Sequence, residues 1–168
     1  MKKSLIASLV GISLLASANL ASASTVYSGS VINATPSACC GLTAPLLLDQ
    51  SGLSSNYVSG VTNFETFTSS NPTHLGTSGT PSTSGYFALA GAFVDIDLGS
   101  TLTLTKLALW NDNDYQGVKN FNLLISDNAL FTGATSLGSF TATYGVGNAF
   151  LDYQIGIDVQ LFDLIDAT

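Results

Sequence analysis

The chain alternates apolar and polar residues with a period of two in its most strongly patterned stretch, VDIDLGSTLTLTKLALWNDNDYQGVKNFNLLIS, from Val94 to Ser126. At its start, Val94 and Ile96 alternate with Asp95 and Asp97. A period of two sends successive side chains to opposite faces of an extended strand, so one face can be buried. The stretch predicts two strands around a polar, acidic turn, and it contains nothing that resembles catalytic machinery.

The same alternation recurs in three later segments, at 121–125, 140–144 and 155–161. Further strands are expected at 25–33, 57–68, 86–98 and 102–110. No apolar pattern with a helical period extends beyond a turn or two, and Thr, Ser, Gly and Asn are abundant. These features predict an all-β fold, an antiparallel jelly-roll β-sandwich, with a long loop at 68–85.

The first 23 residues have the pattern of a secretory signal peptide. Lys2 and Lys3 form a positive region, Leu5–Leu15 is a short apolar run, and Ala21-Ser22-Ala23 is a small-x-small cleavage site. The prediction is a removed leader at 1–23 outside the fold, followed by one domain at 24–168. The alternative is an uncleaved anchor. The expected localisation is secreted, extracellular or at the cell surface.

The charge after residue 23 restricts the partners. This part has two lysines, no arginine and eleven acidic residues, which give a net charge of −9. Nucleic acids and anionic membrane surfaces would be repelled, because binding to either needs Lys and Arg. No membrane span is expected once the leader is removed. An acidic surface favours solubility and divalent cations.

The two cysteines, Cys39 and Cys40, are adjacent. Neighbouring cysteines close a strained ring when they pair with each other, and neither has the spacing of a zinc site. A pair of loop thiols, a vicinal disulfide and an intermolecular bridge all stay open, and neither residue is expected to bind metal.

From Asp49 onward the chain resembles the discoidin domain, also called the coagulation factor V/VIII type C domain, of the galactose-binding-like fold. The segments that carry the resemblance are LLLDQSGLSSNYVSG, VDIDLGSTLTLTKLALWN and GVKNFNLLISDNALF. The sequences of these segments are most similar to those of exported bacterial proteins of the PEP-CTERM type. The resemblance implies a jelly roll whose loops at one end bind sugars, lipids or proteins, often with a structural Ca²⁺.

The chain departs from the family pattern in three places. Asp49-Gln50 stands where the family has Asp-Gly, and Tyr57 stands where it has Trp. The sequence also stops at Thr168, before the family's closing strands and their Glu. The expectation is therefore a C-terminally truncated domain that lacks those strands.

Asp49 is the predicted metal ligand. Ca²⁺ takes six to eight oxygen ligands, and a turn of Asp, Gln, Ser and Gly can supply carbonyl groups beside one carboxylate. The resemblance implies the same calcium loop. The alternative is that Asp49 caps its own turn through the backbone.

Asp112 and Asp114 lie in the turn NDNDYQG, which begins like an EF-hand loop. Leu123 stands where that loop needs its Glu, so a solvated turn is favoured. Asp95 and Asp97 have the pairing of glycosidase carboxylates, but an exposed, solubilising face of the strand is the simpler interpretation.

His74 is the only histidine and no G-x-S-x-G motif occurs, so a Ser-His-Asp triad is not indicated. Its loop suits either a ligand contact or an inert surface position. Tyr57 and Tyr115 are the aromatic rings best placed to meet a sugar, whereas Trp110 is expected in the core.

The sequence thus predicts an exported, non-catalytic binding module that recognises glycans or extracellular polysaccharide at the cell envelope. The alternative is a structural component of the surface or biofilm matrix that acts through protein–protein assembly. The predicted ligand-binding residues are Tyr57, His74, Asp112, Asp114 and Tyr115.

Overall fold

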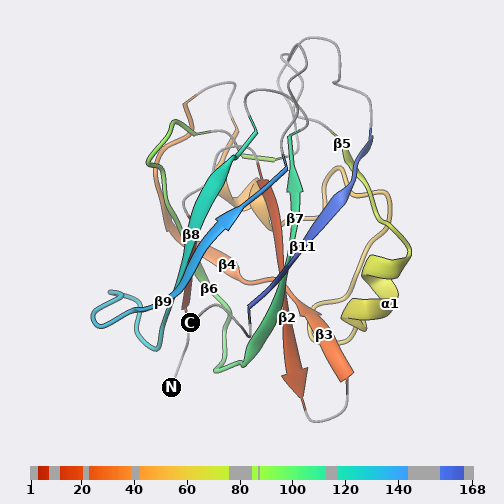
Figure 1. Cartoon of the computed structure of the whole chain (residues 1–168), viewed down its shortest axis with the longest axis horizontal. Coiled ribbons are helices and arrows are strands. Elements are labelled where there is room, and N and C mark those ends of the chain that lie inside the picture. Colours follow the sequence, from red (N-terminus) through yellow and green to blue (C-terminus); the bar gives the residue numbers. More distant parts are fainter. Residues whose placement is uncertain are drawn as a thin grey trace.

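The computed structural model describes residues 4–7, 12–20, 23–38, 42–75, 85–86, 88–112, 117–143 and 156–164. These residues form a mostly β protein with two short helices (Figure 1), and every pair of described strands is antiparallel. The elements are β1 (Ser4–Ala7), β2 (Ile12–Leu20), β3 (Ala23–Tyr27), β4 (Ser30–Ala34), η1 (Ala44–Leu47), α1 (Phe64–Ser69), β5 (His74–Leu75), β6 (Val94–Asp97), β7 (Leu104–Asn111), β8 (Asn120–Ser126), β9 (Thr135–Thr141), β10 (Gly156–Ile157) and β11 (Val159–Asp163).

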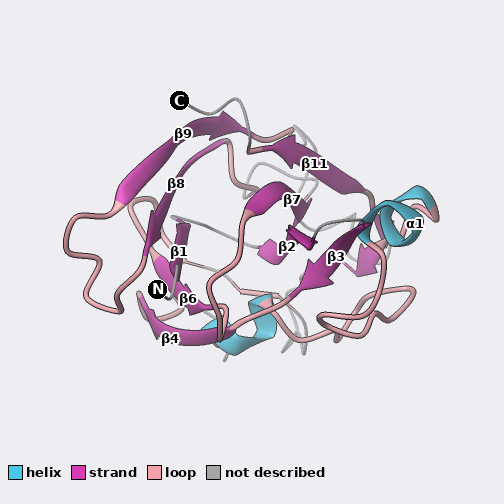
Figure 2. Cartoon of the chain, turned by 90° about the horizontal axis from the view of Figure 1, so that it is seen from below, coloured by secondary structure: helices cyan, strands magenta, loops and turns pink. Residues whose placement is uncertain are grey.

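The strands form two larger sheets and one small one (Figure 2). The five-stranded sheet has the order β4-β6-β1-β8-β9, and the four-stranded sheet has the order β11-β7-β2-β3. β10 and β5 form the two-stranded sheet. The predicted β class with antiparallel pairing is confirmed.

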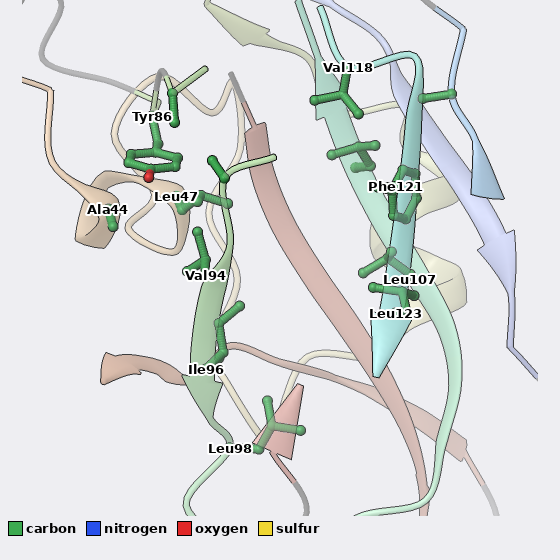
Figure 3. Packing of buried hydrophobic residues seen from close by; sticks show 14 of the residues in the cluster. Ala44, Leu47, Tyr86, Val94, Ile96, Leu98, Leu107, Val118, Phe121 and Leu123 are labelled. Carbon is green, nitrogen blue, oxygen red and sulfur yellow. The ribbon is translucent and has the colours of Figure 1, made fainter. Parts of the chain in front are cut away.

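The two larger sheets share the main hydrophobic core (Figure 3). Val94 and Ile96 come from β6, Leu123 from β8, and Leu107 and Leu109 from β7, and all five are at most 1% exposed. At the start of β8, Phe121 and Leu123 are buried and the asparagines between and before them are exposed, as the period of two predicts. Burial of such side chains stabilises the fold by about 1.5–3 kcal/mol each.

A second core cluster lies beside α1 and contains the only tryptophan. Trp110, Phe64, Phe67 and Tyr57 pack there with Val26. Trp110 is 2% exposed, so its expected place in the core is confirmed. The rings of Tyr57 and Phe67 meet edge to face, with their centroids 5.5 Å apart.

The strand expected at 57–68 is wrong, because its second half is helix α1. Asn63 caps this helix, and its side chain accepts a hydrogen bond from the Thr66 amide at 2.8 Å. An Asn cap satisfies an amide that the first turn leaves without an intrahelical partner. Phe64 and Phe67, three residues apart, then lie on the buried face.

Several other expected strands occur with changed bounds. The strands expected at 102–110 and 121–125 are β7 and β8, while the segment 25–33 divides into β3 and β4. Within 86–98, only β6 forms a strand among the described residues. The expectations for 140–144 and 155–161 correspond to β9, which ends at Thr141, and to β10 with β11.

The N-terminal residues of the uncleaved chain pair with strands of both larger sheets. In this structure of the full chain, β1 lies between β6 and β8, and β2 lies between β7 and β3 (Figure 2). The extended segments 4–7 and 12–20 contain no charged residue, so they can pair inside a sheet without burying a charge. Removal of the leader on export stays a prediction.

Candidate binding rim

Strand ends from distant parts of the sequence meet at one end of the molecule, the upper end in Figure 1. Leu75 of β5 is paired with Gly156 of β10. The Asn111 side chain, at the end of β7, donates a hydrogen bond to the Thr143 carbonyl at 2.8 Å. We call this end, defined by Leu75, Asn111, Val118, Thr143 and Gly156, the upper rim.

Asn111 organises the rim from inside. Its amide Nδ2 donates to the Val118 carbonyl at 2.7 Å, and its Oδ1 accepts from the Val118 amide at 2.7 Å. With the bond to Thr143, one side chain that is 2% exposed ties β7 to the start of β8 and to the end of β9. Buried amides of this kind are held in place because each unpaired polar group is costly.

Gln160 repeats this arrangement on the neighbouring strand. Its Nε2 donates to the Thr143 carbonyl and its Oε1 accepts from the Thr143 amide, both at 2.7 Å. The Thr143 carbonyl therefore receives bonds from both Asn111 and Gln160. Sequence reasoning missed both amides. The available signal was an Asn that ends an apolar strand directly before the polar turn.

The loop that contains Asp49 lies beside β5 and is closed by side chains. Gln50 donates from Nε2 to the Tyr57 carbonyl at 2.9 Å and accepts from the Tyr57 amide at 2.7 Å. Leu53 forms a β-bridge with His74, and the Leu75 amide donates to the Gly52 carbonyl at 2.9 Å. The loop is thereby attached to the same strand, β5, that reaches the rim.

Asp49 is exposed and caps its own turn. Its Oδ1 accepts from the Ser51 amide at 3.0 Å and from the Ser51 hydroxyl. No group of three or more His, Cys, Asp or Glu that could hold a metal ion occurs in the described part of the chain. Ca²⁺ also takes carbonyl and amide oxygens, and calcium at Asp49 stays a prediction.

Tyr57 is buried instead of lying at an exposed loop. Its side chain is 4% exposed and its ring packs on Phe67. Burial raises the pKa of its hydroxyl, an effect that a hydrogen bond with Ser28 opposes. With its ring packed on Phe67, Tyr57 contributes a scaffold side chain below the rim.

His74 lies in β5 and is 3% exposed, so the expected surface position is wrong. Its Nδ1 lies 2.6 Å from the Leu75 carbonyl, which can only accept, so Nδ1 carries the proton. Burial lowers the pKa of the imidazole. The buried Nε2 of His74 makes no hydrogen bond of good geometry. The Ser51 backbone nevertheless lies near enough to favour the protonated imidazole, which partly opposes the effect of burial on the pKa.

Asp112 directly follows Asn111 and is half-buried at the rim. Asp114, Tyr115 and the cysteines Cys39 and Cys40 lie outside the described residues. The structure thus brings His74 and Asp112 to the same end of the molecule, on strands joined through β10 and β11.

Asp95 corrects the expectation of an exposed acidic face. It is 7% exposed, its Oδ2 accepts from Asn33 Nδ2 at 3.1 Å, and its Oδ1 has no partner. Asn33 is the register partner of Asp95, so its side chain lies beside the carboxylate on the neighbouring strand β4. The Asp97 side chain accepts from the Gly99 amide at 2.8 Å, so the two carboxylates serve different local structures.

No protein-family model, curated protein or solved structure matches the chain. Within the described ranges, no helix is long and apolar enough to cross a membrane.

Proposed function

We propose that the chain is an exported, non-catalytic binding module that recognises glycans or extracellular polysaccharide at the cell envelope through the upper rim. In this proposal the two larger sheets form a jelly-roll sandwich of the galactose-binding-like, discoidin type. The protein acts outside the cell or at its surface. The rim residues Asp112, Asp114 and Tyr115 contact the ligand.

The observation that supports the proposal most is the set of hydrogen bonds that the side-chain amides of Asn111 and Gln160 make at the upper rim. Asn111 and Gln160 both bind the Thr143 backbone, and Asn111 also binds Val118. These bonds fix the segments that flank residues 113–116, a polar stretch of sequence that contains Tyr115. A rigid scaffold that carries polar and aromatic loop residues is the usual arrangement of a sugar-binding surface.

The net charge of the chain further restricts the class of ligand that can bind. The part after residue 23 has a net charge of −9 and no arginine. Neutral sugars meet no repulsion there, whereas polyanions do. The proposed ligand is therefore a neutral glycan.

Retention on immobilised neutral polysaccharides tests the proposal. Tyr115→Ala should lower the affinity about tenfold, the loss expected when one stacked ring is removed. The control is Leu130→Ala, because Leu130 is 87% exposed in the connection between β8 and β9, away from the rim. Failure to retain any glycan, or an equal loss in both variants, would contradict the proposal.

A second candidate function, assembly with other copies or matrix proteins, is favoured by strand β4. β4 is an edge of the five-stranded sheet, and it pairs only with β6 among the described strands. Ile32 in β4 is 45% exposed, and Phe93, whose carbonyl accepts from the Thr35 amide just after β4, is 38% exposed. Exposed apolar edges are templates for strand addition. Self-association that persists without sugar and weakens in Ile32→Lys would support this function.

A further inference from the structure

The N-terminal strand pair, which we define as β1 and β2, occupies interior positions in both larger sheets. β1 pairs on both sides, with β6 and with β8. β2 pairs on both sides, with β7 and with β3. The segment predicted to be a removable leader therefore provides the hydrogen-bonding partners for the edges of four strands: β6, β8, β7 and β3.

The register of β1 sets it opposite the core positions of its neighbours. Leu5 is the partner of Ile96 on one side, and Ala7 is the partner of Val94 on that side and of Leu123 on the other. Ile96, Val94 and Leu123 are at most 1% exposed. Without β1, these buried residues would lie beside an open gap.

β2 stands in the same relation to the four-stranded sheet. Leu14 is the partner of Leu109, and Ala16 is the partner of Leu107 in β7 and of Tyr27 in β3. Leu107 and Leu109 are fully buried. β2 pairs with β7 over most of its length, with one shift of register after Ser17.

A cut after Ala23 would remove both strands from the covalent chain. It would open one slot between β6 and β8 and a second between β7 and β3. Each slot would present two facing edges of unpaired backbone amides and carbonyls beside buried aliphatic side chains. Unpaired buried backbone groups and open edges are costly, so the slots need occupants.

We propose that cleavage after Ala23 turns the chain into a strand acceptor. The N-terminal strand pair fills both slots until then, and afterwards an extended, uncharged polypeptide segment of a partner protein takes its place by strand addition. This activity is separate from glycan binding at the upper rim.

The chemistry of the occupant follows from the slots and from the segment that fills them. Residues 4–20 contain no Asp, Glu, Lys, Arg or His and are rich in Leu, Ile, Ala and Ser. Aliphatic or small residues stand opposite Ile96, Val94 and Leu107. Because these neighbours are apolar and buried, a charged residue beside them would find no polar partner among them. The partner segment is thus aliphatic and small, with strand-forming sequence.

The test uses the full chain with a specific protease site inserted between Leu20 and Ala23 and expressed without export, so that no leader is removed beforehand. After cutting, the N-terminal fragment should co-elute with the rest of the chain in size-exclusion chromatography. A fluorescently labelled synthetic peptide of residues 1–22, added in excess, should then exchange into the complex and raise its anisotropy.

Peptide variants keep the test independent of folding in the acceptor. Ala16→Pro removes a backbone donor in the middle of β2, where neighbouring strands lie on both sides. We expect about tenfold weaker binding, as for the loss of one buried hydrogen bond. Ala16→Ser, which keeps the amide, is the matched control and should bind like the parent peptide.

Two results would overturn the proposal. One is separation of the fragment after cutting while the remainder keeps its β circular-dichroism spectrum and its melting temperature. The other is equal binding of the Ala16→Pro and Ala16→Ser peptides. Separation accompanied by loss of β structure or by aggregation would support the proposal, because it shows that the slots need strands.

Discussion

Asn111 and Val118 hold the two ends of the rim turn together through a pair of hydrogen bonds. The Asn111 side chain donates to the Val118 carbonyl and accepts from the Val118 amide, both at 2.7 Å. Both residues are buried, at 2% and 5% exposure. A side chain here makes the two bonds that a neighbouring strand would make, and this closes the segment 112–117.

Asn111→Ala should therefore destabilise the protein strongly. The change removes three hydrogen bonds and leaves the buried backbone groups of Val118 without a partner, whereas the Thr143 carbonyl keeps its bond from Gln160. The expected loss in the free energy of unfolding is about 2–3 kcal/mol, measured by urea denaturation. Asn122→Ala is the control, since Asn122 is exposed and bonds only an exposed serine, Ser139. A loss in the free energy of unfolding no greater than that of the control would contradict the stabilising role of the Asn111 hydrogen bonds.

Gly29 is the position where any larger residue should be rejected. A Cβ there would overlap the Asp97 carbonyl oxygen and lie 2.6 Å from Cγ2 of Ile96. Because the obstacle is mostly backbone, Gly29→Ala should lower the free energy of unfolding by about 1–3 kcal/mol. Ser30→Ala, at the exposed neighbouring position, should change it little. Equal melting temperatures of the two variants would show that β4 moves aside freely.

The sequence allowed the strands with uninterrupted alternation to be predicted. β8 lies close to its expected bounds because the period of two is a local signal, and β7 does so although residues 107–111 are all buried and do not alternate. The helix α1 was missed because six residues contain too little helical period, although Asn63 followed by Phe64 and Phe67 was a readable cap and face.

The rim was only partly predictable, because its geometry depends on contacts between distant residues. The sequence pointed to the polar stretch after Trp110, but the role of Asn111 depends on Thr143, 32 residues later. In the same way Asp95 looked exposed from its alternation, but it is buried and accepts a hydrogen bond from Asn33, 62 residues earlier, on the neighbouring strand. Sequence periodicity says which face of a strand a residue lies on but not which strand lies beside it.

Asp49 has two separable roles to test. As a turn cap it accepts two bonds from Ser51, so Asp49→Ala should cost about 1 kcal/mol at any calcium concentration. As a calcium ligand it should also give the parent protein a melting temperature that rises with added Ca²⁺, since a ligand that binds only the folded state stabilises it. Melting curves with Ca²⁺ and with a chelator distinguish the roles. A calcium-dependent rise that persists in Asp49→Ala would exclude this residue as the ligand.

Asp95 should make the protein less stable as the pH rises. Burial raises its pKa above the ordinary value of 3.8, and the bond from Asn33 only partly opposes this. A raised carboxyl pKa means that the folded state binds the proton more tightly than the unfolded state does. The contribution of this proton to stability is therefore complete below pH 3.8 and is lost as the pH rises through the pKa of the folded state. Asp95→Asn should gain about 1 kcal/mol at pH 7 and nothing near pH 3.5, by urea denaturation. Asp97→Asn is the control, and a similar gain there would contradict the assignment.

His74 should give the opposite slope at a higher pH. Burial lowers its pKa below the ordinary value of 6.5, against smaller effects of the Leu75 and Ser51 backbone and of Asp49. The unfolded chain then binds the proton more readily, so stability is complete above 6.5 and is lost as the pH falls through the folded pKa. His74 is the only histidine, and side-chain carboxyls ordinarily titrate below about 5. In a chain without a histidine tag and with Asp95→Asn as the background, His74→Phe should therefore abolish the change in urea midpoint between pH 7 and pH 5.5. A slope that survives in this variant would assign the titration to another group.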